Sequence, residues 1–306
     1  MTRYAVLGPG GVGGLLAAVL ADRGHEVVVV ARPESVKVLQ DNGIRVVSGV
    51  FGDLVARPRV VAVLDRPIDV VLVAAKATAL EPALCGIPAE VVGDALVVPF
   101  LNGLDHMDVL RRRYPSVAAG VIRVESSRPE VGVIVHSSPF ARVQVATAEP
   151  RLDDRVAAVV RDLADSGFDA ELGGDERAML WDKLAFLAPF ALLTTAHGAP
   201  VGDVRQHHAE EMVAVIEEVA AVSAADGGTG DPAVTVAQFQ RLGAEMKSSM
   251  LRDAEAGNPL ELDAIGGAVL RAAEVSRHTH PAHSGTPREV GGEWIDGVWL
   301  RGLCAA

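Results

Sequence analysis

Short apolar runs alternate with helix-like segments through the first half of the chain. The apolar runs are nearly continuous, as in parallel strands buried on both faces, and the segments between them carry apolar residues at helical spacing. The runs cover residues 3–7, 26–31, 69–74 and 95–100, and the helical segments cover residues 13–23, 35–41 and 107–113. This alternation predicts an α/β domain built on a mainly parallel, doubly wound sheet.

Four more segments of the first half have the composition of strands. A polar turn at Gly52-Asp53 is expected to join the first two, and the last two are expected to form a hairpin. The first pair covers residues 46–50 and 60–64, and the second pair covers residues 131–136 and 141–147.

Beyond about residue 150, strand-like runs nearly vanish and long helical patterns replace them. The predicted helices cover residues 152–166, 176–195, 206–225, 234–254 and 261–275. We therefore place a domain boundary near Gly173-Gly174. The chain is expected to have an N-terminal Rossmann-type doubly wound domain over residues 1–174 and a C-terminal all-helical domain over residues 175–306.

A glycine-rich turn follows the first strand and opens the first helix. It reads Gly8-Pro9-Gly10-Gly11-Val12-Gly13 and contains the spacing G-x-G-x-x-G. In this context the first glycine allows a tight turn, the second lets a pyrophosphate approach the backbone, and the third lets helix and strand pack closely. The N–H groups at the helix start favour phosphate. We expect a dinucleotide to bind here; the alternative is a turn that binds no ligand.

The end of the second strand bears on the choice of nicotinamide cofactor. An acidic residue there usually binds the ribose hydroxyls of NAD, whereas this chain has Arg32 followed by Pro33. A guanidinium at this place can pair with a 2′-phosphate in a bidentate way, so NADP(H) is the expected cofactor. Glu34 lies close enough in sequence to keep NAD open.

Composition excludes several other classes of protein. The chain has 28 Lys and Arg against 40 Asp and Glu, so its net charge is −12 and no basic face for nucleic acid is expected. Its two cysteines, Cys85 and Cys304, are too few for a disulfide scaffold or a four-cysteine zinc site. The longest apolar run, 184–193, contains Pro189 and falls short of the ~20 residues of a membrane span. A soluble, reduced, cytoplasmic protein without membrane or nucleic-acid partners is expected.

Histidines raise the question of a metal. His207 and His208 are adjacent, so on a helix they point in different directions and do not easily share an ion. His207 has Glu210 and Glu211 at helical spacing, a pattern that a solvated helix face shows equally well. A third ligand would have to come from elsewhere in the chain, nothing in the sequence supplies one, and no metal is predicted. Three more histidines stand in the tail at positions 278, 280 and 283, where the sequence indicates no role.

Five motifs occur in an order and at separations that match one known family. They are the glycine turn with Gly24-His25-Glu26-Val27 and Ala31-Arg32 behind it; Val73-Ala74-Ala75-Lys76-Ala77; Leu101-Asn102-Gly103; Trp181-Asp182-Lys183-Leu184; and Ser248-Ser249-Met250 with Asp253, Gly257, Pro259, Glu261 and Asp263. On these motifs, residues 3 to 270 resemble the ketopantoate reductases (2-dehydropantoate 2-reductases). The resemblance implies NADPH-dependent reduction of a 2-oxo acid to a 2-hydroxy acid, at an active site between the two domains.

The resemblance also implies roles for individual residues. Lys183 would be the catalytic acid, because a lysine near the cofactor can give a proton to the substrate carbonyl. Glu261 would orient the substrate, and Ser249 would bind its carboxylate. Asn102 and Lys76 follow buried strands, where such folds bind ligands. The alternatives are a surface lysine, a helix-start glutamate, an exposed serine, a turn asparagine and a loop lysine.

The chain departs from the family along the helix that carries Lys183. Leu187 and Ala191 stand where the family commonly has substrate-binding asparagines, four and eight residues after the lysine and on the same helix face. Pro189 should bend this helix, and Leu260 replaces a usual threonine beside the glutamate. These changes leave the proton and hydride chemistry in place and put the identity of the substrate in question.

Three hypotheses for the function follow. The leading one is a ketopantoate reductase-like enzyme, in which Arg252 and Thr194 could take over recognition of the substrate hydroxyl. The second is a paralogue that reduces a more apolar keto acid or an imine, which Leu187 and Ala191 favour. The third is a non-catalytic NADP-binding sensor, and the presence of Lys183 disfavours it. Monomer and homodimer both stay open.

Overall fold

A computed structural model describes residues 1–279, 302 and 304. The chain divides into two compact units, each described by itself below. Unit 1 comprises Met1–Leu101 and Asp105–Glu176, and unit 2 comprises Asn102–Leu104 and Arg177–Ala306. The short loop 102–104 therefore groups with the helical unit although the chain on either side of it belongs to unit 1.

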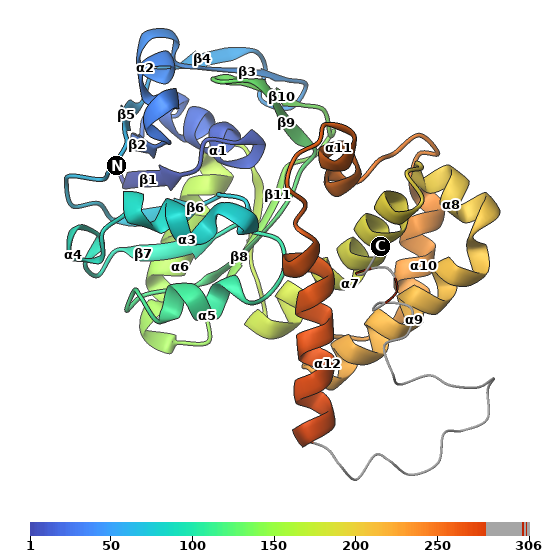
Figure 1. Cartoon of the computed structure of the whole chain (residues 1–306). Coiled ribbons are helices and arrows are strands. Elements are labelled where there is room, and N and C mark those ends of the chain that lie inside the picture. Colours follow the sequence, from blue (N-terminus) through green and yellow to red (C-terminus); the bar gives the residue numbers. More distant parts are fainter. Residues whose placement is uncertain (280–301, 303, 305–306) are drawn as a thin grey trace. The chain divides into compact units, whose positions relative to one another are not determined.

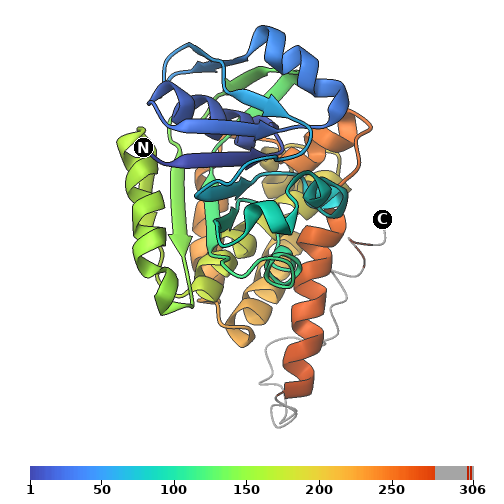
Figure 2. The ribbon, with the colours of Figure 1, turned by 90° about the vertical axis from the view of Figure 1, so that its left-hand side faces the viewer.

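Unit 1 is built on a five-stranded, all-parallel sheet with the strand order β5-β2-β1-β6-β7 (Figure 1). Its strands are β1 (Arg3–Leu7), β2 (Glu26–Val30), β5 (Arg59–Val61), β6 (Val70–Val73) and β7 (Leu96–Pro99). The blue and teal strands run side by side in Figure 2. The order reverses at β1, which pairs with β2 on one side and β6 on the other. The predicted doubly wound parallel sheet is confirmed.

Helix α1 (Gly11–Asp22) lies between this sheet and a second, four-stranded sheet. The second sheet has the order β4-β3-β10-β9, and its strands are β3 (Ile44–Ser48), β4 (Leu54–Ala56), β9 (Ser126–Glu130) and β10 (Val133–His136). Residues from Gly13 to Leu20 are all buried, because a helix covered on both sides has no solvated face.

A third sheet with the order β12-β11-β8 completes unit 1, and α6 (Asp153–Asp165) packs along it, as the yellow-green helix in Figure 2 shows. Its strands are β8 (Ala119–Arg123), β11 (Arg142–Ala146) and β12 (Asp169–Leu172). The predicted hairpin over residues 131–147 is wrong, since β10 and β11 belong to different sheets. β10 pairs with β3 instead, and buried His136 at its end also hydrogen-bonds Ser48 of β3 at 2.8 Å.

The predicted turn at Gly52-Asp53 also connects different strands from those expected. It joins β3 to the short antiparallel β4, while the following strand β5 pairs with β2 in the main sheet. The remaining helices of unit 1 are α2 (Pro33–Asn42), η1 (Ala77–Ala79), α3 (Leu80–Ala83), η2 (Leu84–Gly86), α4 (Ala89–Val92), α5 (His106–Arg111) and η3 (Pro150–Leu152).

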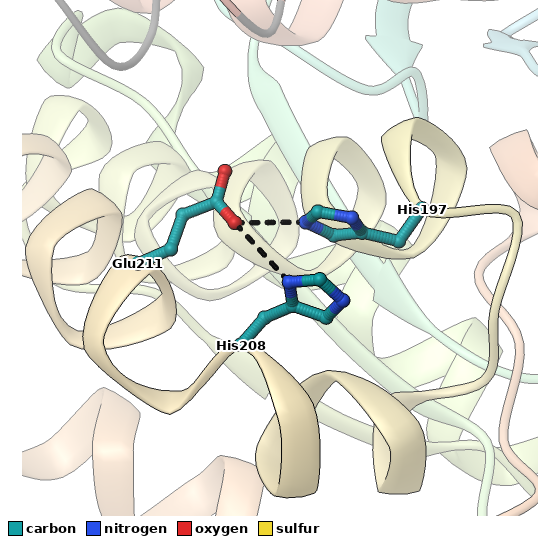
Figure 3. Close-up of side chains that lie close together, drawn as sticks. All are labelled: His197, His208 and Glu211. Carbon is teal, nitrogen blue, oxygen red and sulfur yellow. Dashed lines mark hydrogen bonds and ion pairs between the residues drawn. The ribbon is translucent and has the colours of Figure 1, made fainter.

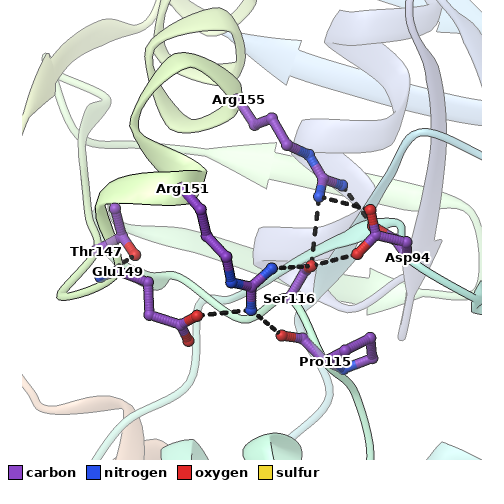
Figure 4. Close-up of polar contacts among 7 residues, drawn as sticks. All are labelled: Asp94, Pro115, Ser116, Thr147, Glu149, Arg151 and Arg155. Carbon is purple, nitrogen blue, oxygen red and sulfur yellow. Dashed lines mark hydrogen bonds and ion pairs between the residues drawn. The ribbon is translucent and has the colours of Figure 1, made fainter.

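A polar cluster fastens the start of α6 to the loops around β7 and β8 (Figure 4). The Arg151 and Arg155 side chains both donate to the Ser116 hydroxyl, which itself donates to Asp94 at 2.6 Å. Arg155 also pairs with Asp94, and Arg151 pairs with Glu149 at 2.6 Å. Two guanidinium groups thus face two carboxylates, so the cluster is balanced in charge and stabilises unit 1 without forming an anion site.

Unit 2 contains helices joined by loops, and no strand occurs among its described residues. Its helices are α7 (Glu176–Ala196, of which Glu176 groups with unit 1), α8 (Val201–His207), α9 (Ala209–Ala225), α10 (Pro232–Arg241), α11 (Ser249–Glu255), the π-helical turn η4 (Asp263–Gly267) and α12 (Ala268–Thr279). Two predicted helices are each broken in two. Residues 206–225 split at His208, and residues 234–254 split at the loop between α10 and α11.

Helix α7 is the one helix in the described part of the chain that is long and apolar enough to cross a membrane. Its 18-residue window has a mean hydropathy of 1.2, and 61% of that window is buried inside the protein. The helix predicted over residues 176–195 is confirmed to within one residue, and it continues through Pro189. Burial on this scale is typical of a core helix, and Phe186 and Phe190 pack there against Phe239 of α10.

Candidate functional site

The glycine turn lies at the place where the strand order of the main sheet reverses. Gly8 follows β1 with φ +88°, and a Cβ there would stand 2.9 Å from the backbone of Ala75, just after β6. Ala74 donates its N–H to Leu7 O at 2.9 Å, which holds the two strand ends together. In open α/β sheets, ligands bind at the carboxyl ends of the strands at this switch point.

Two of the remaining glycines of the turn pack against other backbone, whereas one faces open space. A Cβ on Gly13 would stand 2.2 Å from Gly8 O, so only glycine allows this contact of helix and strand. A Cβ on Gly11 would stand 2.3 Å from Ser126 O of β9, and Ser126 donates to Gly11 O at 2.9 Å. Around Gly10, by contrast, nothing lies within 4 Å of such a Cβ. Gly10 is therefore the glycine of the turn that a ligand can approach, while Gly11 is required for packing.

The start of α1 has the features of an anion site. Its N-cap, Gly10, makes no side-chain cap, and its first turn contains no acidic residue. The first N–H groups of a helix have no acceptor within the helix, and the helix dipole adds partial positive charge there. Pro9 is buried and Val12 packs against the core, which holds the turn in place. Residues 8–13 therefore fit a pyrophosphate.

Arg32 stands directly beyond β2 and is 72% exposed. Its Nε lies 3.2 Å from Glu34 Oε1, and Glu34 is 63% exposed. A pair this exposed contributes little stability and can rearrange. The guanidinium can therefore turn to a 2′-phosphate, and the Glu34 carboxylate that now pairs with it would compete with such a ligand.

Two further predicted site residues follow β6 and β7, the strands that lie on the opposite side of β1 from β2. Lys76 is exposed, three residues beyond β6, at the start of η1. Asn102 comes three residues beyond β7 and belongs to unit 2. Its side-chain amide donates to Glu261 Oε2 at 3.0 Å across 159 positions of sequence. The structure thus brings together two residues that the sequence predicts for the site.

Glu261 is buried, with only 8% of its surface exposed, and it is hydrogen-bonded to Asn102. Beside it, Gly103 has φ +85°, and a Cβ there would stand 2.0 Å from Ala264 O. The loop after β7 therefore lies directly against the chain that follows Glu261, and a side chain at position 103 would separate them. The Glu261 carbonyl accepts from Ile265 N at 3.0 Å, an α-type bond that ties Glu261 to the π-helical turn Asp263–Gly267.

Lys183 lies half-buried on α7, whose position in unit 2 depends on Trp181. The Trp181 side chain is fully buried, and its indole N–H donates to Asp226 Oδ2 at 2.8 Å. Arg177 pairs with the same carboxylate from one turn earlier. In the Trp-x-Lys-Leu motif, the tryptophan therefore anchors the helix and the lysine is left at its surface.

The positions four and eight residues beyond Lys183 differ in burial. Leu187 is half-buried, whereas Ala191 is 0% exposed. The stripe therefore leads from the surface into the core of unit 2, and Ala191 presents no surface to a ligand in this structure. Thr194 is also buried and hydrogen-bonds Phe190 O and the Ser248 hydroxyl, so its hydroxyl is engaged within the core.

Ser248 and Ser249 have different places at the start of α11. Ser248 is buried, and its hydroxyl caps the helix by accepting from Leu251 N at 3.0 Å. Ser249 is exposed at the first helical position. Its role as a substrate binder stays a prediction, while Ser248 has a structural explanation that the sequence did not indicate.

The sequence did not predict one cluster of side chains that could bind a metal ion. His197, His208 and Glu211 come together in unit 2 (Figure 3). Sequence spacing pointed instead to His207, which is exposed. The third member, His197, lies on the far side of the connection between α7 and α8, and no local pattern predicts that it reaches the other two.

Two family models match the chain. One, described as ketopantoate reductase PanE/ApbA, matches residues 4–150, and the other, described as its C-terminal part, matches residues 175–286. Among curated relatives, the uncharacterized oxidoreductase YkpB of Bacillus subtilis (strain 168) is 28% identical over 282 residues, 89% of this chain and 92% of the relative. The 2-dehydropantoate 2-reductase of Archaeoglobus fulgidus is 29% identical over 276 residues, 89% and 91% of the two chains.

Solved structures show the same architecture. A PanE/ApbA family ketopantoate reductase from Ralstonia eutropha JMP134 has a TM-score of 0.83 at 24% identity, covering 99% of this chain and 96% of its own. D-Mandelate dehydrogenase, in a ternary structure with NADH and anilino(oxo)acetate, has a TM-score of 0.83 at 17% identity with the same coverage. At these identities the likeness shows the fold alone, and the predicted fold class is confirmed.

Proposed function

The chain belongs to the ketopantoate reductase PanE/ApbA family of oxidoreductases, and from this premise we propose that it reduces a 2-oxo acid to the 2-hydroxy acid with NADPH. The observation that most strongly supports the proposal is the hydrogen bond from Asn102 to Glu261, 3.0 Å long. It joins two polar side chains of separate motifs at a buried carboxylate, an arrangement that a non-catalytic sensor does not need.

The residues present fit a nicotinamide dinucleotide. The uncapped start of α1 and the open space at Gly10 suit the pyrophosphate, and Arg32 suits a 2′-phosphate. Lys76 is assigned to the same ligand because it follows β6, the neighbour of β1. When bound, the nicotinamide supplies the hydride that reduces the carbonyl carbon of the substrate.

Lys183 supplies the proton in this proposal. Its ammonium group donates to the substrate carbonyl oxygen as the carbon is reduced, and the neutral amine then takes a proton from water. Glu261 accepts a hydrogen bond from the hydroxyl of a substrate that carries one, such as ketopantoate, and the Asn102 amide holds the Glu261 carboxylate in orientation. Ser249 is assigned to the substrate carboxylate. Lys183 is half-buried on α7 beside the buried Leu184, so its contact with bulk water is limited.

A screen of NADPH consumption across a panel of 2-oxo acids, ketopantoate included, tests this function. Oxidation of NADPH with at least one acid, and formation of the matching 2-hydroxy acid, is the expected result. A protein that binds NADPH tightly but oxidises it with no member of the panel would be the sensor instead.

The cofactor preference depends on Arg32. Changing Arg32 to Asp should weaken NADPH binding by more than tenfold, about 1.4 kcal/mol, because the guanidinium partner of the 2′-phosphate is lost and a like charge replaces it. NADH, which lacks that phosphate, should bind at least as well as before. Dissociation constants of both cofactors, from fluorescence titration, measure the change.

Arg66→Asp is the matched control, because Arg66 pairs with Glu26 at the opposite end of β2. It should leave both dissociation constants unchanged. Equal binding of NADPH and NADH by the unmodified protein, with no effect of Arg32→Asp on either, would show that the assignment of NADP is wrong.

We further propose that the preferred substrate is more apolar than ketopantoate. Leu187 offers methyl groups where the family commonly has an amide, and each buried methylene of a substrate contributes ~0.8 kcal/mol. A branched or longer 2-oxo acid without the terminal hydroxyl should therefore be reduced at least as efficiently as ketopantoate. A preference of the unmodified protein for ketopantoate of more than about 100-fold, or 2.7 kcal/mol, would contradict this.

Leu187→Asn tests the same idea from the other side. One added hydrogen bond of about 1 kcal/mol should shift the ratio of kcat/KM values roughly fivefold towards ketopantoate. The accompanying change Ala191→Asn is not suitable, because the fully buried position would enclose an unsatisfied amide. Leu172→Asn, at a 57% exposed position of unit 1, is the matched control and should leave the ratio unchanged.

A further inference from the structure

Three side chains of metal-ligand type converge at the C-terminal end of α7. His197 directly follows α7, His208 stands between α8 and α9, and Glu211 lies in the first turn of α9 (Figure 3). His197 Nε2 is 2.8 Å from Glu211 Oε2, and His208 Nδ1 is 3.7 Å from the same oxygen. From this geometry we infer a binding site for a divalent transition metal of the zinc class.

The separations suit an ion placed between the three atoms. Ligand atoms that each hold zinc at about 2.0–2.1 Å in a tetrahedron stand about 3.4 Å apart. The two observed separations, 2.8 and 3.7 Å, lie on either side of that value. All the ligand atoms of the group lie within 4.8 Å of one another, so rotation of the side chains can place them around one ion.

A simple hydrogen-bonded cluster accounts for only part of this arrangement. The contact of His197 with Glu211 has the length of a hydrogen bond, but His208 Nδ1 lies beyond that distance from the same oxygen. The two imidazole rings are stacked with centroids 3.5 Å apart and an interplanar angle of 18°. Because an imidazole binds a metal through a lone pair in its ring plane, the two stacked rings have to turn apart to share one ion.

The backbone holds the ligands in place before any ion binds. His197 N donates to Leu193 O at 3.1 Å, which extends the hydrogen bonding of α7 to the ligand. His208 N donates to Val204 O, and Met212 N donates to His208 O, both at 2.9 Å. His208 therefore lies at the end of α8 and at the beginning of α9. The backbone at both histidines is therefore fixed, and only the side chains have to rearrange when an ion binds.

The donor set selects the class of ion. Two imidazole nitrogens and one carboxylate oxygen suit zinc and its neighbours, whereas magnesium and calcium prefer oxygen alone. The side chains are 22%, 36% and 19% exposed for His197, His208 and Glu211, so an ion can enter and water can complete the coordination. The ion would fasten the end of α7, the helix that carries Lys183, to the corner between α8 and α9.

Titration of the full chain with Zn²⁺ in a calorimeter tests the site, with the adjacent exposed His207 as a matched control. The unmodified protein and His207→Ala should each bind one zinc at this site. His208→Ala and His197→Ala should bind it at least ~100-fold more weakly, since even loss of an outer-shell partner costs 10–100-fold. Zinc should also raise the melting temperature of the unmodified protein and of His207→Ala. It should not raise that of His208→Ala or His197→Ala.

Glu211→Gln is the second line of the test, because it keeps the size of the side chain and removes the charge. It should weaken zinc binding while its circular dichroism spectrum stays that of the unmodified protein. The histidines of the tail are present in every variant, so any zinc they bind is a common background. Zinc binding that is absent above this background in the unmodified protein, or equally weakened by His207→Ala and His208→Ala, would overturn the proposal.

Discussion

Replacing Lys183 by alanine is expected to reduce turnover by about 100-fold or more, the scale of general acid catalysis, while NADPH binds almost as before. The proton of the reaction then has to come from water, which is not positioned at the carbonyl oxygen. Lys183 lies on α7 in unit 2, whereas the glycine turn and Arg32 belong to unit 1, so the substitution leaves the proposed cofactor residues untouched. Steady-state kinetics and a fluorescence titration with NADPH separate the two effects.

Lys37→Ala is the matched control for this substitution. Lys37 is 85% exposed on α2, where it pairs with Asp41 at 3.0 Å, and its loss should change neither turnover nor binding. An unchanged rate in Lys183→Ala would refute the proposed mechanism. An equal loss of NADPH affinity and turnover would instead indicate that Lys183 has a structural role.

Replacing Glu261 by glutamine should lower kcat/KM by about 10- to 100-fold, which corresponds to the 1.5–3 kcal/mol of a hydrogen bond to a charged group. The carboxylate is 8% exposed and accepts a hydrogen bond from Asn102 at 3.0 Å. With ketopantoate as the substrate, the two oxygens of the Glu261 carboxylate can accept from Asn102 and from the substrate hydroxyl. Glutamine keeps the shape but has only one oxygen, so it cannot accept both hydrogen bonds in the same way. Kinetics at saturating NADPH measure the effect.

The pair of Asn102 and Glu261 can be tested as a unit. Asn102→Ala combined with Glu261→Gln should lose less activity than the sum of the single losses, with a coupling of about 0.5–3 kcal/mol, because each residue acts through their shared hydrogen bond. Glu255→Gln, at an exposed carboxylate that pairs with Lys247, is the control and should leave kcat/KM unchanged. Strict additivity of the two losses would show that the pair is not part of one site.

Local patterns of the sequence were sufficient for the elements that carry the cofactor residues. β1, the turn at Gly8 and α1 follow one another directly in the chain, and their contacts lie within a few residues, as between Gly13 and Gly8. Near-continuous valine runs identified the buried parallel strands, because such strands have no solvated face. The identity of Lys183 as a candidate acid likewise depended on its neighbours in sequence.

These patterns did not predict which strands pair with one another. β9 reads Ser-Ser-Arg-Pro-Glu, which has the composition of a loop, yet it pairs with β10 and covers Gly11. Its pairing separates β10 from β11 and makes the expected hairpin wrong. This strand forms despite its polar sequence because it pairs with the edge of β10, which begins three residues later in the chain.

The sequence by itself determined which residue types stand on which element, including Lys183 and Leu187 on one helix face. Only the tertiary structure decided that Asn102 reaches Glu261 across 159 positions, that Ala191 is enclosed in the core, and that His197 meets His208 and Glu211. Periodicity reports the direction of a side chain relative to its own helix or strand. Which faces meet depends on how all the elements of a unit pack, and no short segment carries that information.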